Sequence, residues 1–186
     1  YYALDKEGHA THTNSQLAKE AVVKLLDQDF DLSKVEILSC GTTSPDQLLP
    51  AHAAMVHGEL GGHTMEINST SGACSAGIQA LKFGYLSVLS GCANNAVCTG
   101  SERFSRWMLA KFFKEEAAKV ARLEGDGIIA FEKDFLRFML SDGAGAALLQ
   151  SAPNPSGLSL KIEWIEQRSF ANELPTCMYA GAIKEP

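Results

Sequence analysis

A chain of 186 residues with 46% hydrophobic and 20% charged residues has the length and composition of a single globular domain. Its net charge of −6 disfavours nucleic-acid binding, which usually needs a surplus of basic residues, and no apolar run approaches the roughly 18 residues of a membrane span. The five cysteines lack CxxC spacing and predict neither a disulfide framework nor a zinc site, so we expect a cytoplasmic protein.

Helical and strand patterns alternate along the chain. We predict helices over residues 14–27 (capped by Thr13 or Asn14), 50–59 and 74–90. Strands are predicted over 35–40, 63–67, 95–99, 144–150 and 158–165, the last as an outer antiparallel strand, and 68–73 and 141–143 as turns. A helical excursion over 101–131 and a short apolar element over 134–140 interrupt this series. The alternation indicates an α/β fold with helices packed on a sheet.

The chemically informative stretch is residues 67–81, in which a strand runs into small residues and then into Cys74 at the start of a helix. This is the pattern of a nucleophile elbow. The helix N-terminus offers unpaired N–H groups and positive partial charge, which favour the thiolate and can hold an oxyanion. The residues alone leave a second interpretation open, namely that Cys74 is a small buried hydrophobe. For Cys40, Cys92, Cys98 and Cys177 we expect that packing role.

Three ordered motifs resemble the thiolase-like condensing enzymes, above all the β-ketoacyl-acyl-carrier-protein synthase III group. The run Gly-Ala-Cys-Ser-Ala-Gly-Ile-Gln-Ala-Leu at 72–81 is similar to that family's nucleophile segment. Residues 27–50, which end Cys-Gly-Thr-Thr-Ser-Pro-Asp-Gln-Leu-Leu-Pro, resemble the strand and loop upstream of it. Residues 140–149, Leu-Ser-Asp-Gly-Ala-Gly-Ala-Ala-Leu-Leu, resemble its Gly-Asp-Gly-Ala strand. Together the resemblance covers roughly residues 14–165.

The resemblance implies a layered α/β/α fold that forms the first half of a two-half structure, with residues 1–186 lacking the second half. The ends agree, since the chain begins with Tyr rather than Met and stops without a closing helix or strand. In this family Cys74 would accept an acyl group from a coenzyme A or carrier-protein thioester, with its own N–H as half of the oxyanion hole. Leu49 would reach the acyl pocket of the partner subunit in a homodimer.

The same resemblance implies a decarboxylative Claisen condensation with a malonyl-acyl-carrier-protein extender and without a metal or redox cofactor. The family's catalytic His and Asn lie in the second half, so we expect this chain alone to be inactive. Two alternatives remain: a condensing enzyme of specialised metabolism, such as those making aryl polyenes or dialkylresorcinols, and a non-catalytic partner subunit that docks carrier protein. Such partners usually lack the nucleophile, so Cys74 disfavours the second.

Other polar residues have less specific interpretations. A Cys–His dyad between Cys74 and His52, His57 or His63 is conceivable, but structural or surface roles are favoured for these histidines. The basic residues within 103–122 could dock an acidic carrier protein, although a solvated helix is favoured. The helix at 74–90 carries more apolar residues than one layer covers. In the family that the chain resembles, the strand after this helix pairs across a dimer two-fold, so the resemblance implies that residues 93–99 form that edge.

Overall fold

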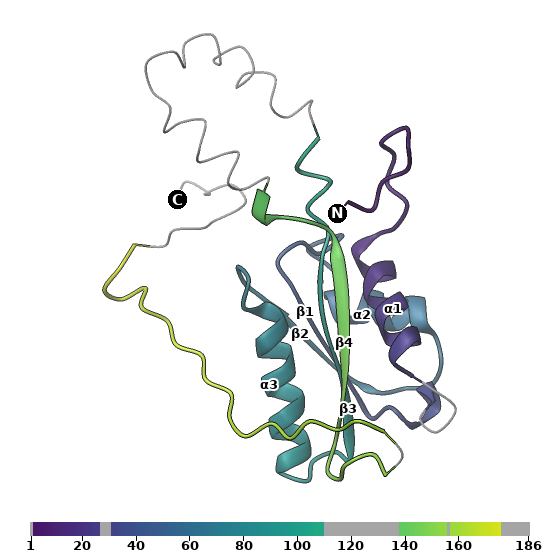
Figure 1. The fold of residues 1–186 in the computed structure, drawn as a ribbon, viewed down its shortest axis with the longest axis vertical. Helices are drawn as coiled ribbons and strands as arrows, with labels where there is room; N and C mark the ends of the chain where they lie inside the picture. The colour runs from purple at the N-terminus through teal and green to yellow at the C-terminus, as the bar shows by residue number, and fades with distance from the viewer. Residues whose placement is uncertain (1, 27–30, 110–137, 156, 176–186) are drawn as a thin grey trace.

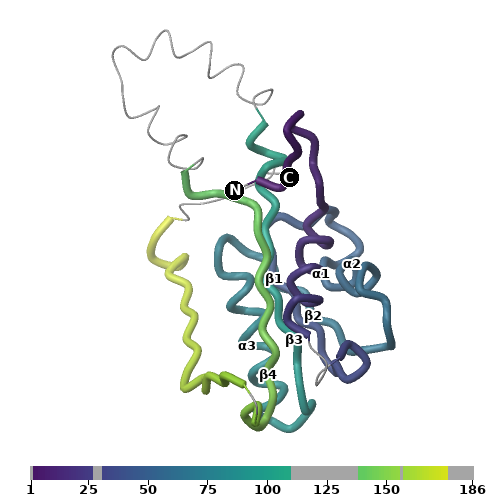
Figure 2. Tube along the Cα trace, turned by 45° about the vertical axis from the view of Figure 1, so that its right-hand side comes forward, coloured from purple at the N-terminus to yellow at the C-terminus, as the bar shows by residue number. Residues whose placement is uncertain are grey.

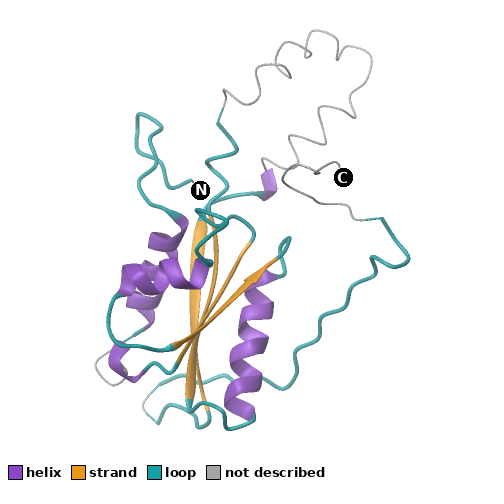
Figure 3. Ribbon diagram, turned by 180° about the vertical axis from the view of Figure 1, so that it is seen from behind, coloured by secondary structure: helices purple, strands orange, loops and turns teal. Residues whose placement is uncertain are grey.

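The computed structural model of the protein describes residues 2–26, 31–109, 138–155 and 157–175. Its core has three layers (Figure 1). Helices α1 (Asn14–Leu25) and α2 (His52–Leu60) cover one face of a four-stranded sheet, and α3 (Ala76–Leu89) covers the other, as Figure 3 shows from behind. The predicted layered α/β/α architecture is confirmed. No helix in the described part of the chain is long and apolar enough to cross a membrane.

The sheet has the order β2-β1-β3-β4, with β1 at Ile37–Thr42, β2 at Glu66–Ser71, β3 at Asn95–Glu102 and β4 at Gly143–Gln150. Strand β1 pairs in parallel with β2 and β3, and β4 returns antiparallel to β3. The expectation that residues 93–99 form an edge strand is therefore wrong. All eight residues of β3 pair with β4 on one side, and β1 occupies the other. Among the described strands the edges are β2 and β4.

The helices follow the predicted periodicity closely. Helix α1 begins behind a capping box in which Thr13 accepts from the N–H of Gln16 and the Gln16 side chain accepts from Thr13. Asp46, from a distant loop, adds a second cap by accepting the N–H groups of Asn14 and Ser15, both at 2.8 Å. Helix α2 ends at Gly61, whose φ of 65° suits glycine.

The strands are shifted from their predicted bounds, most of all β2. Residues 68–71 were expected in a turn because they are small and polar, but they pair with β1 in register. Their polar side chains are satisfied from neighbouring elements: Asn68 donates to the Ser39 hydroxyl at 2.9 Å, and Ser69 accepts the N–H of Ala53 at 2.7 Å. Long-range hydrogen bonds thus outweigh the local turn preference of these residues.

The predicted strand at 158–165 is wrong. Residues 157–175 form an extended segment on the α3 side of the molecule (Figure 2), and residues 158–165 pair with none of the described strands. Leu158, Leu160 and Trp164 are 90%, 84% and 76% exposed. Alternating apolar residues form a strand only where they pair with a sheet edge, and no such pairing forms here.

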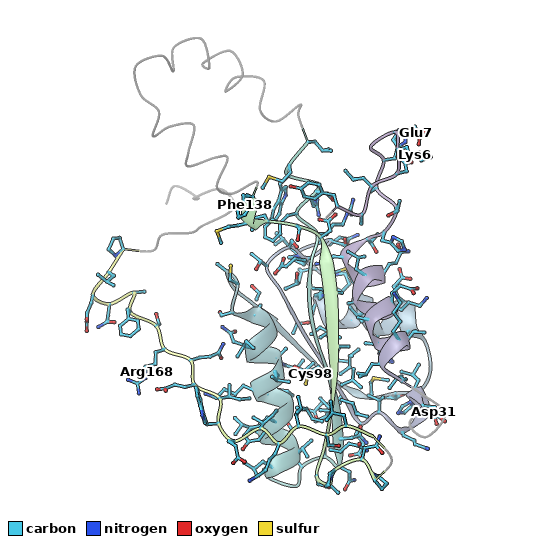
Figure 4. The ribbon with its side chains drawn as sticks, in the orientation of Figure 1. Lys6, Glu7, Asp31, Cys98, Phe138 and Arg168 are labelled. Atoms are coloured by element: carbon cyan, nitrogen blue, oxygen red, sulfur yellow. The ribbon has the colours of Figure 1, made fainter. Side chains whose placement is uncertain are left out.

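The predicted excursion at 101–131 lies largely outside the described residues. Residues 101 and 102 belong to β3, and the rings of Phe104 and Trp107 meet edge to face with centroids 5.4 Å apart. Only residues 103–109 of the basic segment 103–122, and only residues 138–140 of the predicted element 134–140, are described. Phe138 projects away from the sheet at 89% exposure (Figure 4).

Candidate functional site

The candidate site lies where the carboxyl ends of the three parallel strands meet the beginning of β4. Strands β1, β2 and β3 end there at Thr42, Ser71 and Glu102, and β4 starts there at Gly143. Ligands of open α/β sheets bind outside the carboxyl ends of the parallel strands. The connection from β2 to α3 therefore places residues 72–75 in the region where chemistry is expected.

Cys74 lies in this connection, between the last residue of β2 and the first residue of α3, and it is exposed. Its φ is +61°, a left-handed conformation that residues other than glycine rarely adopt and that concentrates at functional sites. A strained turn from strand to helix is the geometry of a nucleophile elbow. The predicted position of Cys74 is confirmed, except that the helix starts at Ala76, two residues further on.

Hydrogen bonds from both sides hold the turn. The Thr43 hydroxyl donates to the carbonyl of Gly72 at 2.8 Å, and the Thr70 hydroxyl donates to the carbonyl of Ala76 at 2.7 Å. Within the turn, the N–H of Ser75 donates to the carbonyl of Ala73 at 2.7 Å. These bonds fix the backbone on either side of Cys74.

Three glycines let the first turn of α3 lie directly on the sheet. A Cβ on Gly41 of β1 would stand 2.2 Å from the carbonyl oxygen of Ala76, a distance no structure tolerates. Gly77 of α3 and Gly100 of β3 face each other, and a Cβ on either would lie 3.3 Å from the other's Cα. The close approach brings the N-terminal end of α3, with its unpaired N–H groups, to the carboxyl ends of the two central strands, β1 and β3.

Two cavities, of about 380 and 370 Å³, share Cys74, Gly77 and Gly100 in their walls. The first extends over the strand ends and is lined further by Gly41, Thr43, Ser101, Glu102, Phe104, Met139, Leu140, Ser141 and Gly143. The second runs between α3 and β4 and is lined further by Ile78, Leu81, Cys98, Thr99, Gly145, Ala146 and Ala147. Cys74 thus stands where the two cavities meet, exposed to a molecule that enters from the strand ends.

No family model matches the chain. The chain is 29% identical to β-ketoacyl-[acyl-carrier-protein] synthase III of Clostridium perfringens over 159 aligned residues. The alignment covers 85% of this chain and 41% of that relative. AbyA1, a tetronic acid condensing enzyme, matches with a TM-score of 0.62 and 25% identity over 83% of this chain and 41% of that structure. β-Ketoacyl-[acyl-carrier-protein] synthase III of Thermus thermophilus matches with a TM-score of 0.56 and 24% identity, over 80% and 40%.

The fold is that of the thiolase-like condensing enzymes. The resemblance predicted from the three motifs is confirmed, and the chain spans about two fifths of the length of these relatives. That it corresponds to their first half remains a prediction.

Leu49, the residue that the condensing-enzyme resemblance assigns to the partner's acyl pocket, lies in the loop after β1. It is 81% exposed, as is its neighbour Leu48 at 93%, and neither lines the two cavities. An exposed apolar pair on a loop is typical of a contact with another protein surface. The structure of one chain does not test the proposed role of Leu49 in substrate binding, which stays a prediction.

The other described cysteines divide into two kinds. Cys40 and Cys98 are buried, and burial raises the pKa of each thiol to about 12, so the expected packing role is confirmed for both. Figure 4 shows Cys98 on β3. The same expectation is wrong for Cys92, which is exposed because it follows the end of α3 in a surface turn. Cys177 lies outside the described residues.

Of the three histidines considered as partners of Cys74, His52 and His57 have side-chain partners elsewhere, and His63 is exposed. His52 is buried at the start of α2, where its Nε2 lies 3.1 Å from the Ser101 hydroxyl. Burial lowers its pKa, against the raising effect of Asp46 and Glu102. His57 Nε2 lies 3.0 Å from the carbonyl of His63. None of the three lines either cavity, so structural roles are favoured, as predicted.

Sequence reasoning missed Thr43, Glu102 and Asp142. Thr43 and Glu102 follow or end parallel strands, a position that could have identified them as neighbours of the site. Asp142 was assigned to a simple turn, but it is buried and accepts the N–H groups of Ala3 and Ser105 at 2.7 and 2.8 Å. It ties the N-terminal segment to the site across 139 positions of sequence, which no local pattern reveals.

Proposed function

We propose that this chain is part of an acyltransferase that performs a decarboxylative Claisen condensation, with Cys74 as the nucleophile that accepts the acyl group. One observation carries the proposal: in a condensing-enzyme fold, the left-handed residue between β2 and α3 is a cysteine exposed to two cavities. The similarity to β-ketoacyl synthase III supports the same reaction class.

In the first step, the Cys74 thiolate attacks the carbonyl of an acyl thioester carried by coenzyme A or by acyl carrier protein. The oxyanion of the tetrahedral intermediate would be held by backbone N–H groups, that of Cys74 among them, beside the positive end of α3. Collapse breaks the thioester bond and releases the carrier thiol, which takes up a proton. The acyl group remains on Cys74 as a new thioester.

In the second step, malonyl-acyl-carrier-protein loses carbon dioxide, and its α-carbon attacks the acyl carbonyl on Cys74. The Cys74 thiolate leaves, and the product is a β-ketoacyl thioester on the carrier protein. In condensing enzymes a His and an Asn outside the matched motifs promote this step, so we expect residues 1–186 by themselves to acylate slowly at most. The chemistry requires no metal or redox cofactor, because the nucleophile and the thioesters supply every reacting group.

The proposed partners are acyl carrier protein and a second copy of the chain, and the proposed location is the cytoplasm. The four described cysteines are all free, which supports a reducing compartment. A condensing enzyme of specialised metabolism is the second candidate, supported by the match to a tetronic acid condensing enzyme at 25% identity. Both candidates keep Cys74 as the nucleophile that accepts the acyl group.

The test is self-acylation of the protein as encoded, incubated with acyl-coenzyme A and analysed by peptide mass spectrometry. We expect the acyl adduct on Cys74 and its loss in Cys74→Ala. Cys92→Ala is the matched control, because it removes the other exposed cysteine of the described chain, and it should acylate like the wild type. An adduct confined to Cys40, Cys92, Cys98 or Cys177, with Cys74 unmodified, would contradict the proposal.

A further inference from the structure

A network of polar side chains lies directly behind the turn that carries Cys74, and Glu102 stands at its centre. One carboxylate oxygen of Glu102 accepts the backbone N–H of Thr43 at 2.7 Å, and the other accepts the Ser44 hydroxyl at 2.5 Å. The Thr42 hydroxyl lies 3.5 Å from the second oxygen. Charge-assisted bonds of this kind are stronger than those between neutral groups. Glu102 therefore binds the start of the loop that follows β1.

Thr43 connects Glu102 to the turn at residues 72–75 through two hydrogen bonds. Its N–H is held by Glu102 on β3, while its hydroxyl donates to the carbonyl of Gly72, two residues before Cys74. The three residues come from three separate segments of the chain, and Thr43 and Glu102 are 59 positions apart. A backbone with a positive φ at Cys74 persists only where its surroundings fix it.

We propose that Glu102 is a positioning residue for Cys74: it fixes Thr43, whose hydroxyl holds the carbonyl of Gly72 and keeps the cysteine in its left-handed conformation. The inference deepens the proposed function and rests on it for its kinetic consequence. Both carboxylate oxygens of Glu102 accept hydrogen bonds from the loop after β1, one from Thr43 and one from Ser44, and this geometry supports action through Thr43. The variants below separate this role from a direct contact between Glu102 and substrate.

Two pairs of variants isolate this chain of contacts. Glu102→Ala removes both acceptors, whereas Glu102→Gln keeps the side-chain length and one acceptor oxygen for the N–H of Thr43. Thr43→Val removes the hydroxyl at nearly constant shape, whereas Thr43→Ser retains it. In each pair the first variant should break the restraint, and the second should largely preserve it.

The first measurement is amide hydrogen exchange over residues 70–78 in the protein as encoded, which reports on the turn whether or not acylation occurs. We expect faster exchange there in Glu102→Ala and Thr43→Val, with Glu102→Gln and Thr43→Ser close to the wild type. Exchange in α1 serves as the control for general unfolding, and it should not change. Unchanged exchange over 70–78 in both disrupting variants would overturn the positioning role.

The second measurement is the rate at which acyl-coenzyme A acylates Cys74. Misplacement of a nucleophile lowers the rate of the chemical step, so we expect a loss of at least about tenfold in the maximal rate for Glu102→Ala and Thr43→Val, with little change in the half-saturating substrate concentration. The double variant should be no slower than the slower single variant, because both break one chain of contacts. Full activity in Thr43→Val beside an inactive Glu102→Ala would overturn the proposal and assign Glu102 a direct role. If the wild-type protein does not acylate Cys74, the proposed function is contradicted. The amide exchange over residues 70–78 then tests the positioning role of Glu102 without the acylation rates.

Discussion

Among the described residues, the face of the sheet under α1 and α2 buries a cluster of eight apolar side chains, whereas the face under α3 buries four. The difference lies mainly in the helices. Helix α3 leaves Ile78, Leu86 and Leu89 exposed by 48%, 49% and 67%. Leu86 is an apolar residue that the sheet does not cover, as predicted, whereas Phe83 packs against the buried cluster under the helix. Among the described helices, α3 thus presents the most exposed large apolar side chains, and exposed apolar patches mark interaction surfaces.

The largest expected effect is a difference in alkylation rate between the buried cysteines of the two sheet faces and the exposed Cys74. Under a pulse of iodoacetamide near neutral pH, Cys40 and Cys98 should react at least about a hundredfold more slowly than Cys74, because burial raises the pKa of both thiols to about 12 and the thiolate is the nucleophile. Each face of the sheet contributes one of these buried thiols. The readout is the mass of each cysteine peptide against time.

Cys92 is the matched control in the same experiment. It is exposed like Cys74, but it follows the C-terminal end of α3, where the partial charge is negative, whereas Cys74 precedes the N-terminal end. Cys74 should therefore react faster than Cys92. Faster labelling of Cys92, or labelling of Cys40 at a similar rate, would contradict the assignment of Cys74 as the activated thiol.

Two leucine-to-alanine variants compare how much stability is lost in the buried cluster under α1 and α2 and on helix α3. Leu38→Ala, in the closed cluster, should lower the free energy of unfolding by about 2–5 kcal/mol, because it leaves a cavity. Leu86→Ala removes the same atoms from a side chain that is half exposed, and it should cost less than about 1 kcal/mol. Urea unfolding of the protein as encoded gives both values. Equal costs would show that other protein covers the outer side of α3.

The smallest expected effect is a pH dependence of stability due to His52, which packs against the closed face. Burial lowers its folded pKa, while the unfolded chain protonates near the ordinary value of 6.5. The unfolded state therefore binds more protons below that value, and stability is lost as the pH falls through the folded pKa, by no more than about 1.4 kcal/mol per pH unit.

His52→Gln should remove this slope, because glutamine can still bond to Ser101 but does not titrate. His57→Gln, which alters a histidine near the surface of the same helix, should leave it in place. Urea unfolding between about pH 7.5 and pH 5 gives the comparison. A slope that persists in His52→Gln would show that another group is responsible.

Sequence predicted the helices better than the strands, for a physical reason. A helix satisfies its own backbone hydrogen bonds, so local residues mark where it begins and ends. Thr13 and Gln16 mark the start of α1, and Gly61 marks the end of α2. A strand needs a partner, and the partner decides where pairing stops. Residues 68–71 became part of β2 because they pair with β1, whereas residues 158–165 pair with no described strand and therefore do not form one.

The sequence by itself determined an α/β fold with helices packed on a sheet, from its apolar periodicity, and the nucleophile candidate, from small residues before a cysteine between a strand and a helix. The layered α/β/α architecture was implied by the resemblance to the condensing enzymes. The tertiary structure alone decided the positive φ of Cys74, the contact between Gly77 and Gly100, and the restraint that runs from Glu102 through Thr43 to Gly72. The two contacts join residues that are distant along the chain, and only the order of strands in the sheet brings them together.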